Sequence, residues 1–122
     1  MKYKLTIVIL ACALLIGGSI AETVYIEKTF DNFEGKIEVL LNRETYTIEE
    51  IEDLSAWWAK KAEVLEIFIS VLQLNEITVT IGELEGAVRK EDYDSASALV
   101  DRIYEYSVRI KDMYRVKLNN IL

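Results

Sequence analysis

No proline occurs in the 122 residues of this chain, and only five residues are glycine. Proline lacks a backbone N–H and glycine is the most flexible residue, so these two most often end or kink a helix. A chain with so few of them is expected to form long helices joined by short connections. Two of the glycines, Gly17 and Gly18, lie in the N-terminal segment, where we expect them to break a helix.

The N-terminal segment has the order of an export signal. A short basic region, KYK, precedes an uncharged run over residues 5–21, and Ser19 and Ala21 then place small residues at −3 and −1 of a cleavage site before Glu22. The run is also just long enough to span a membrane. Residues 1–21 are therefore predicted to be a cleaved signal peptide or a membrane anchor, and residues 22–122 a helical domain.

A third interpretation of this segment is lipidation at Cys12, because Ile-Leu-Ala-Cys loosely resembles a lipobox. All three interpretations put the body of the protein outside the cytoplasmic membrane, since the positive flank stays inside. Two of the 14 basic residues and none of the 21 acids precede Glu22, so the body has a net charge of −9. That charge argues against nucleic acid as a partner, because phosphate binding needs a basic surface.

Histidine is absent, and Cys12 is the only cysteine. Zinc sites, disulfides, thiol nucleophiles and imidazole bases are therefore excluded from residues 22–122. We expect no enzyme, no cofactor and no metal site. The acids of residues 49–53 could form a cation site, but we interpret them as charges that favour a helix N-terminus.

Apolar residues repeat at the spacing of three and four that places them on one face of a helix. Four such rows follow one another along the body and predict an all-α fold. Because the connections are short, neighbouring helices should be antiparallel. The expected architecture is an antiparallel four-helix bundle of two helical hairpins, with a tetratricopeptide-like arrangement as the alternative. In chain order the rows are Ile26, Phe30, Phe33, Ile37 and Leu40; Ile51, Trp58, Ala62, Leu65, Ile69 and Leu72; Leu74, Ile77, Ile81, Leu84 and Val88; and Ala96, Val100, Ile103, Ser107, Ile110 and Met113.

The helix ends are marked unequally. The first helix is expected to end near Asn42, and Thr47 followed by Glu50 predicts a capping box for the second. The break between the second and third helices has no such signal. A single helix over residues 47–90 would be about 65 Å long, too long for a small domain to bury, so we place a turn within residues 70–75.

Two further features mark the fourth helix. Asp92 or Asp94 can cap its N-terminus. The segment KEDYD there resembles RETYT 47 residues earlier, and we expect Tyr46 and Tyr93 to pack over the hairpin ends. Basic residues gather towards its C-terminus, where the helix dipole favours them, with membrane contact as the alternative explanation. These are Arg102, Arg109, Lys111, Arg115 and Lys117.

Trp57 and Trp58 are neighbours, so they point about 100° apart and cannot both occupy the centre of one buried face. Trp58 lies on the apolar row and is predicted to be core. Trp57 lies on an adjoining row and either packs at the rim of the core or contacts a partner. Together with Tyr104, Tyr106 and Tyr114 it is a candidate for partner contact, because Trp and Tyr are favoured at interfaces.

The segments WWAKKAEVLEIFI and EDYDSASALVDRIYEYSVRI, with the terminal LNNIL, resemble a family catalogued as domain of unknown function 4363. Its members look like short bacterial proteins with an N-terminal apolar segment and a helical body. Trp58, with Leu54 before it and Lys61 after it, resembles the family's characteristic tryptophan. The resemblance implies no known activity and carries over no catalytic residue.

The predicted function is that of a non-enzymatic, exported or membrane-anchored helical module that binds another protein. The partner is expected to be a protein, and a membrane protein is one candidate. If residues 1–21 are not cleaved, they are expected to bind the membrane as well. The alternative is an extracytoplasmic sensor of a small ligand or cation, although the D-x-D-x-D-G pattern of a calcium loop is missing from the sequence.

Overall fold

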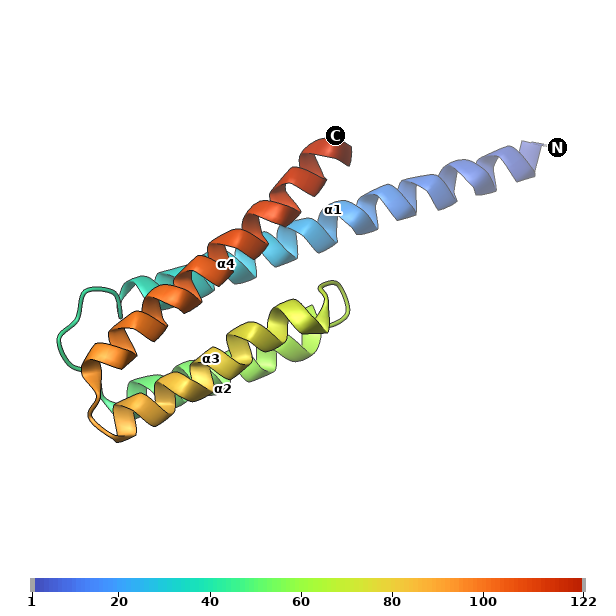
Figure 1. Ribbon diagram of the computed structural model, residues 1–122. Coiled ribbons are helices and arrows are strands. Elements are labelled where there is room, and N and C mark those ends of the chain that lie inside the picture. Colours follow the sequence, from blue (N-terminus) through green and yellow to red (C-terminus); the bar gives the residue numbers. More distant parts are fainter. Residues whose placement is uncertain (1, 122) are drawn as a thin grey trace.

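The protein forms four helices in the computed structural model, which describes the backbone of residues 2–121 and the side chains of residues 3–114. The helices are α1 (Lys2–Glu38), α2 (Ile48–Leu65), α3 (Val71–Arg89) and α4 (Tyr93–Ile121). No strand occurs within residues 2–121. Figure 1 shows that α1 extends far beyond the other helices at its N-terminal end.

The helices pack in the order in which they follow along the chain, and the ring closes between α1 and α4. Each helix runs antiparallel to the next, and α1 and α4 lie side by side as extensively as α3 and α4 do. In Figure 1 both termini and the α2–α3 turn lie towards the right-hand end of the bundle, while the other two connections lie at the opposite end. The predicted antiparallel bundle is thus confirmed, and the contact between the first and last helices distinguishes it from a tetratricopeptide-like stack.

The core consists of the apolar rows that the sequence predicted. All five residues of the first row and all five of the third are buried, and the second and fourth rows are buried except for Leu72 and Met113 at their ends. Ser107 is also fully buried, and its hydroxyl donates to the Tyr104 carbonyl oxygen at 2.8 Å. The three-and-four spacing therefore identified nearly all of the core, because only residues at that spacing share the inner face of a helix.

The predicted helix break at Gly17 and Gly18 is wrong. α1 continues through both glycines without interruption. No atom beyond the helix's own backbone lies within 4 Å of where a Cβ would be at either position. A glycine costs a helix about 1 kcal/mol relative to alanine, and that cost alone does not end it. The apolar segment and the first helix of the bundle are consequently one continuous rod.

The turn between α2 and α3 comes earlier than predicted, at residues 66–70 rather than within residues 70–75. Tight i to i−3 bonds end α2, from the Ile67 N–H to the Val64 carbonyl oxygen and from the Phe68 N–H to the Leu65 carbonyl oxygen. The helical register restarts at Val71, so Leu72 faces outward instead of continuing the apolar row. The turn and the start of α3 therefore carry exposed apolar side chains, Ile67 in the turn and Val71 and Leu72 in α3.

The other two connections use left-handed backbone conformations. α1 ends at Glu38, and Asn42, near which we expected the end, has a φ of 60°. After α3, Glu91 has a φ of 57°. The Ser95 N–H then donates to a carboxylate oxygen of Asp92 at 3.3 Å, so Asp92 rather than Asp94 caps α4.

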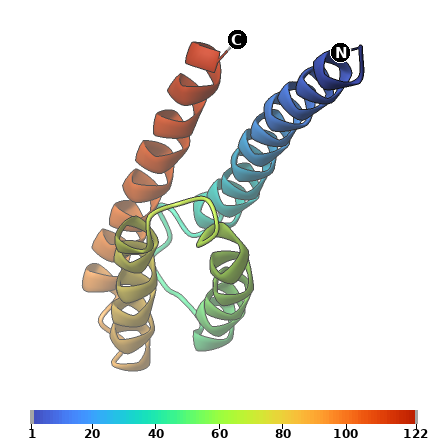
Figure 2. The ribbon, with the colours of Figure 1, turned by 90° about the vertical axis from the view of Figure 1, so that its right-hand side faces the viewer.

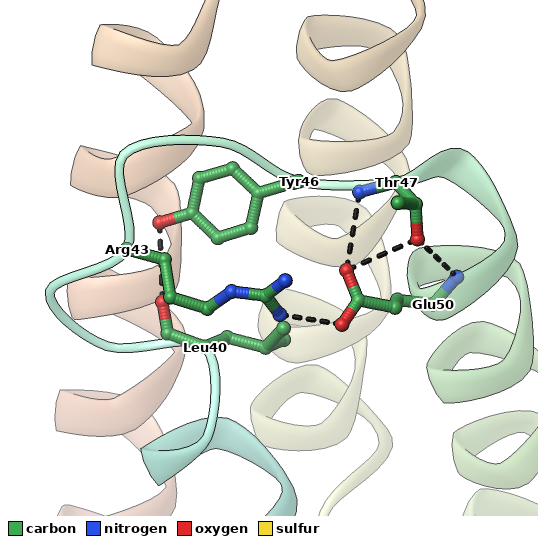
Figure 3. A network of polar contacts seen from close by, with 5 residues as sticks. All are labelled: Leu40, Arg43, Tyr46, Thr47 and Glu50. Carbon is green, nitrogen blue, oxygen red and sulfur yellow. Dashed lines mark hydrogen bonds and ion pairs between the residues drawn. The ribbon is translucent and has the colours of Figure 1, made fainter.

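The start of α2 is a complete capping box (Figure 3). The Glu50 N–H donates to the Thr47 hydroxyl, while the Thr47 N–H donates to a Glu50 carboxylate oxygen at 3.1 Å. The other carboxylate oxygen forms an ion pair with Arg43. Tyr46 closes the loop by donating from its hydroxyl to the Leu40 carbonyl oxygen at 3.1 Å, and its ring lies 6.2 Å from that of Tyr93. The predicted cap is confirmed, and both tyrosines pack on the core at the hairpin ends, as predicted. That their rings also contact each other is a finding of the structure.

Replacing Thr47 with Ala is expected to cost about 1 kcal/mol of stability, because it removes the side-chain acceptor of the cap.

The hydrogen bond from Arg43, together with the hydrogen bonds from Thr47, holds the pKa of Glu50 below its ordinary value of 4.5. The stabilisation from the ionised Glu50 is therefore present above pH 4.5 and is lost as the pH falls through the lower folded-state pKa. Urea unfolding followed by circular dichroism between pH 7 and pH 3 measures both effects, and a Thr47→Ala variant as stable as the parent at pH 7 would contradict the first.

Candidate functional site

The N-terminal half of α1 is an apolar helix whose side chains are exposed. Residues 3–18 are all exposed, whereas burial begins at Ser19 and is complete at Thr23. By length and composition α1 could cross a membrane, and it is the one such helix among residues 2–121. The exposed large apolar side chains of this half are Tyr3, Leu5, Ile7, Val8, Ile9, Leu10, Leu14, Leu15 and Ile16.

Aromatic rings fill the space between α1 and α2. Trp58 is 2% exposed and contacts Phe33 at a ring-centroid distance of 4.9 Å and Phe30 at 6.2 Å. Its indole N–H donates to the Thr78 hydroxyl on α3 at 2.9 Å. The backbones of α1 and α2 approach each other less than the other neighbouring helices do, because these large rings stand between them. Trp58 is thus a core residue, as predicted.

Trp57 is half-buried at the edge of the same aromatic layer. Its ring stacks on that of Phe33 at 5.9 Å with an interplanar angle of 16°. The ammonium groups of Lys36 and Lys61 lie 5.2 Å and 5.9 Å from its ring centroid, within the range of a cation–π interaction. Trp57 therefore packs at the rim of the core within this chain and keeps part of its ring exposed.

The three candidate tyrosines lie on α4 and are also partly buried against the core. Tyr106 lies under the guanidinium of Arg109 at 5.8 Å, and Tyr104 lines a shallow hollow with Val108. The Tyr114 hydroxyl donates to the Phe68 carbonyl oxygen at 3.2 Å, and burial raises the pKa of Tyr114 above its ordinary value. Tyr114 thus ties the end of α4 to the α2–α3 turn.

The four predicted contact residues do not form one surface. Trp57 lies on α2 and the tyrosines on α4, and these helices are diagonal in the bundle, with no close approach of their backbones in the described part of the chain. Tyr104 and Tyr106 are two residues apart, so they flank the buried row of α4 on opposite sides. The fold therefore does not bring these four residues together in a single surface patch.

One ionic cluster between α1 and α4 is not indicated by any pattern in the sequence. The sequence places Lys111 among the basic residues that the helix dipole favours near the C-terminus of α4. In the structure Lys111 forms an ion pair with Asp31, and its Nζ lies 3.5 Å from a Glu34 carboxylate oxygen. The Lys111 and Glu34 side chains are each only 15% exposed. The Asp31 hydrogen bond and the neighbouring Glu34 raise the pKa of Lys111 above its ordinary value. No local pattern could predict this cluster, because its members are about 80 residues apart.

Two other basic residues of α4, Arg102 and Arg109, are more exposed. Arg102 approaches Glu83 at 4.0 Å, with both side chains half-exposed. Arg115 and Lys117 have side chains outside the described residues. Among the described residues, no three acidic or cysteine side chains lie close enough to hold a metal ion. Of the acids in residues 49–53, Glu50 and Glu52 form ion pairs with Arg43 and Arg89.

Comparison with known proteins gives a family but no described activity. The model of a domain of unknown function, DUF4363, matches residues 20–121, which are the bundle without most of the exposed apolar helix. Neither the curated proteins nor the solved structures contain a match to this chain. With over four fifths of its residues covered by the family model, the chain belongs to the DUF4363 family.

Proposed function

We propose that this protein is a membrane-anchored, non-enzymatic binding module whose helical body stands outside the cytoplasmic membrane. The observation that carries the proposal is the unbroken α1, which is wholly exposed over residues 3–18 and buried in the bundle from Thr23 onward. Sixteen consecutive exposed residues, mostly apolar, are costly in water and are accommodated in a bilayer. The two lysines before the apolar run favour an orientation with the N-terminus inside.

The helical state of the cleavage site favours an anchor over a removed signal peptide. The bond after Ala21 lies within α1, and the Thr23 hydroxyl bridges it by donating to the Ser19 carbonyl oxygen at 2.9 Å. Proteases cut exposed, flexible segments more readily than helices packed against a folded body. We therefore expect the apolar half of α1 to remain in the mature protein.

The protein-binding role is supported by aromatic side chains that the chain buries only in part. Trp57, Tyr104 and Tyr106 each keep exposed surface while their rings pack on the core. Rigid aromatic rings of this kind contribute strongly to binding because little conformational entropy is lost when they are covered. Since Trp57 and the tyrosines lie on diagonal helices, and Tyr104 and Tyr106 lie on opposite sides of the buried row of α4, we expect a partner to use one of these surfaces.

The proposal is tested by affinity purification of the full-length protein from native membranes with mass spectrometry. We expect the protein to stay in membranes washed with alkaline carbonate, to retain its residues before Glu22, and to recover a specific protein. Replacing both Tyr104 and Tyr106 with Ala should reduce that recovery, whereas Val79→Ala, at a half-exposed apolar site on α3, should not.

A mature N-terminus at Glu22 would contradict the anchor. Recovery of no protein above background, together with a monomeric body, would contradict the binding role.

A further inference from the structure

The α2–α3 turn carries apolar side chains that the bundle does not cover. Ile67 is 74% exposed and Leu72 80% exposed, and Val71 between them is also exposed. Over residues 65–73 the only charged residue is Glu66. We call Ile67, Val71 and Leu72 the turn patch. Exposed apolar residues this close together usually mark a contact surface.

The position of the turn patch relative to α1 identifies what it contacts. The Phe68 ring in the turn lies 6.4 Å from that of Tyr25 on α1, one helical turn after the apolar run ends at Ala21. Figure 2 shows the α2–α3 turn at the end of the bundle from which α1 emerges. With the apolar run embedded in a bilayer, the turn is held at the level where hydrocarbon meets headgroups.

A continuous apolar surface joins the anchor to the turn. A hollow between α1 and the end of α2 is lined by Gly18, Ala21, Tyr25, Val64 and Phe68, with Glu22 as its one charged residue. Val64 is itself 40% exposed beside the turn. A lipid surface can cover such an uneven apolar area because acyl chains adapt to its shape, whereas a rigid partner must match it.

We infer that the α2–α3 turn is a second membrane contact, in which Ile67, Val71 and Leu72 insert into the headgroup region of the leaflet on which the bundle stands. The inference rests on the proposed anchoring of α1. One helix alone would leave the body free to lean, and a second apolar contact about 10 Å to its side limits that freedom, this being the distance between packed helices. Insertion of a few apolar side chains by 5–10 Å is typical of interfacial segments.

The test uses the full chain in phosphatidylcholine vesicles, with an environment-sensitive nitrobenzoxadiazole (NBD) dye on single cysteines. The background variant is Cys12→Ala, since Cys12 is the only native cysteine. The labelled variants are Ile67→Cys and Leu72→Cys. The matched control is Val39→Cys, which is similarly exposed, at 68%, but lies at the opposite end of the bundle. Unchanged circular dichroism melting relative to the background shows that labelling leaves the fold intact.

We expect the emission of dye at positions 67 and 72 to shift to the blue. Lipids that carry a nitroxide close to the headgroup should quench most of this emission. Dye at position 39 should keep its emission and be quenched by aqueous iodide instead. If the proteoliposomes float but positions 67 and 72 behave as position 39 does, the inference fails while the anchor stands. If no variant floats with the vesicles, the anchor fails, and this inference with it. Protection from iodide without quenching by the lipid nitroxide would mean that protein covers the turn, which also overturns the inference.

Discussion

Replacing Trp58 with Ala is expected to destabilise the bundle by about 3–5 kcal/mol, the range for removing a large buried aromatic ring. Trp58 is 2% exposed, touches Phe30 and Phe33 on α1, and donates a hydrogen bond to Thr78 on α3. Its loss therefore opens a cavity where three helices meet. A small domain has only about 5–15 kcal/mol of stability in total, so the variant should be partly unfolded under mild denaturation.

The matched variant is Trp57→Ala. Trp57 is half-buried and makes one stacked contact with Phe33, so its removal should cost only about 1 kcal/mol. Urea unfolding of both variants in the same detergent, followed by circular dichroism, measures the difference. Equal losses of stability would show that Trp57 is core as well, and would leave no exposed part of it for a partner.

The second large effect is expected from Lys111→Met, which should cost about 2 kcal/mol by leaving a charged group without its partner. Lys111 from α4 lies between Asp31 and Glu34 of α1, and its side chain and that of Glu34 are mostly shielded from water. Without the ammonium group the two carboxylates face each other. Adding Glu34→Gln to the variant should restore much of the stability, which a purely steric effect of Met would not allow.

Arg102→Met is the control, because its pair with Glu83 is half-exposed on both sides and should be worth only a few tenths of a kcal/mol. The pH dependence provides a second test. The folded-state pKa of Lys111 is raised above 10.5, so its stabilisation is fully present below pH 10.5 and is lost as the pH rises through the folded-state value. Equal effects of the two variants at pH 7 would contradict the special role of Lys111.

The sequence predicted the parts of this fold that depend on residues close together in the chain. The Thr47–Glu50 box is confirmed, and so are the apolar rows apart from Leu72 and Met113 at their ends, because a helix places residues three and four apart side by side. The bundle order followed from short connections. Packing between distant segments was beyond such reasoning, and the pairing of Lys111 with α1 is the clearest example.

The two errors in the helix boundaries have a common physical origin. Gly17 and Gly18 predict a break that α1 does not have, and no residue type marks the turn after Leu65. Intrinsic propensity is weak next to tertiary packing. The turn lies where Leu65 and Ile69 can both be buried, and no local residue type reports that condition.

The repeated segments RETYT and KEDYD illustrate a partial success. Their tyrosines meet at one end of the bundle, with ring centroids 6.2 Å apart. The caps that follow differ, however, because Thr47 comes after Tyr46 whereas Asp92 comes before Tyr93. Similar residues thus support similar positions in the fold without adopting the same local geometry.

The continuity of α1 makes the protein a lever. With 37 residues and a rise of about 1.5 Å per residue, α1 is about 55 Å long, and it has no hinge between its apolar half and the bundle. In the proposed anchored state, a tilt of about 20° in the membrane would swing the far end of the bundle, about 25 Å from Glu22, sideways by about 9 Å. A neighbouring membrane protein that tilts α1 strongly enough to lift the α2–α3 turn from the membrane would thereby move the proposed contact residues on α2 and α4, and the body would report the movement without changing its own fold.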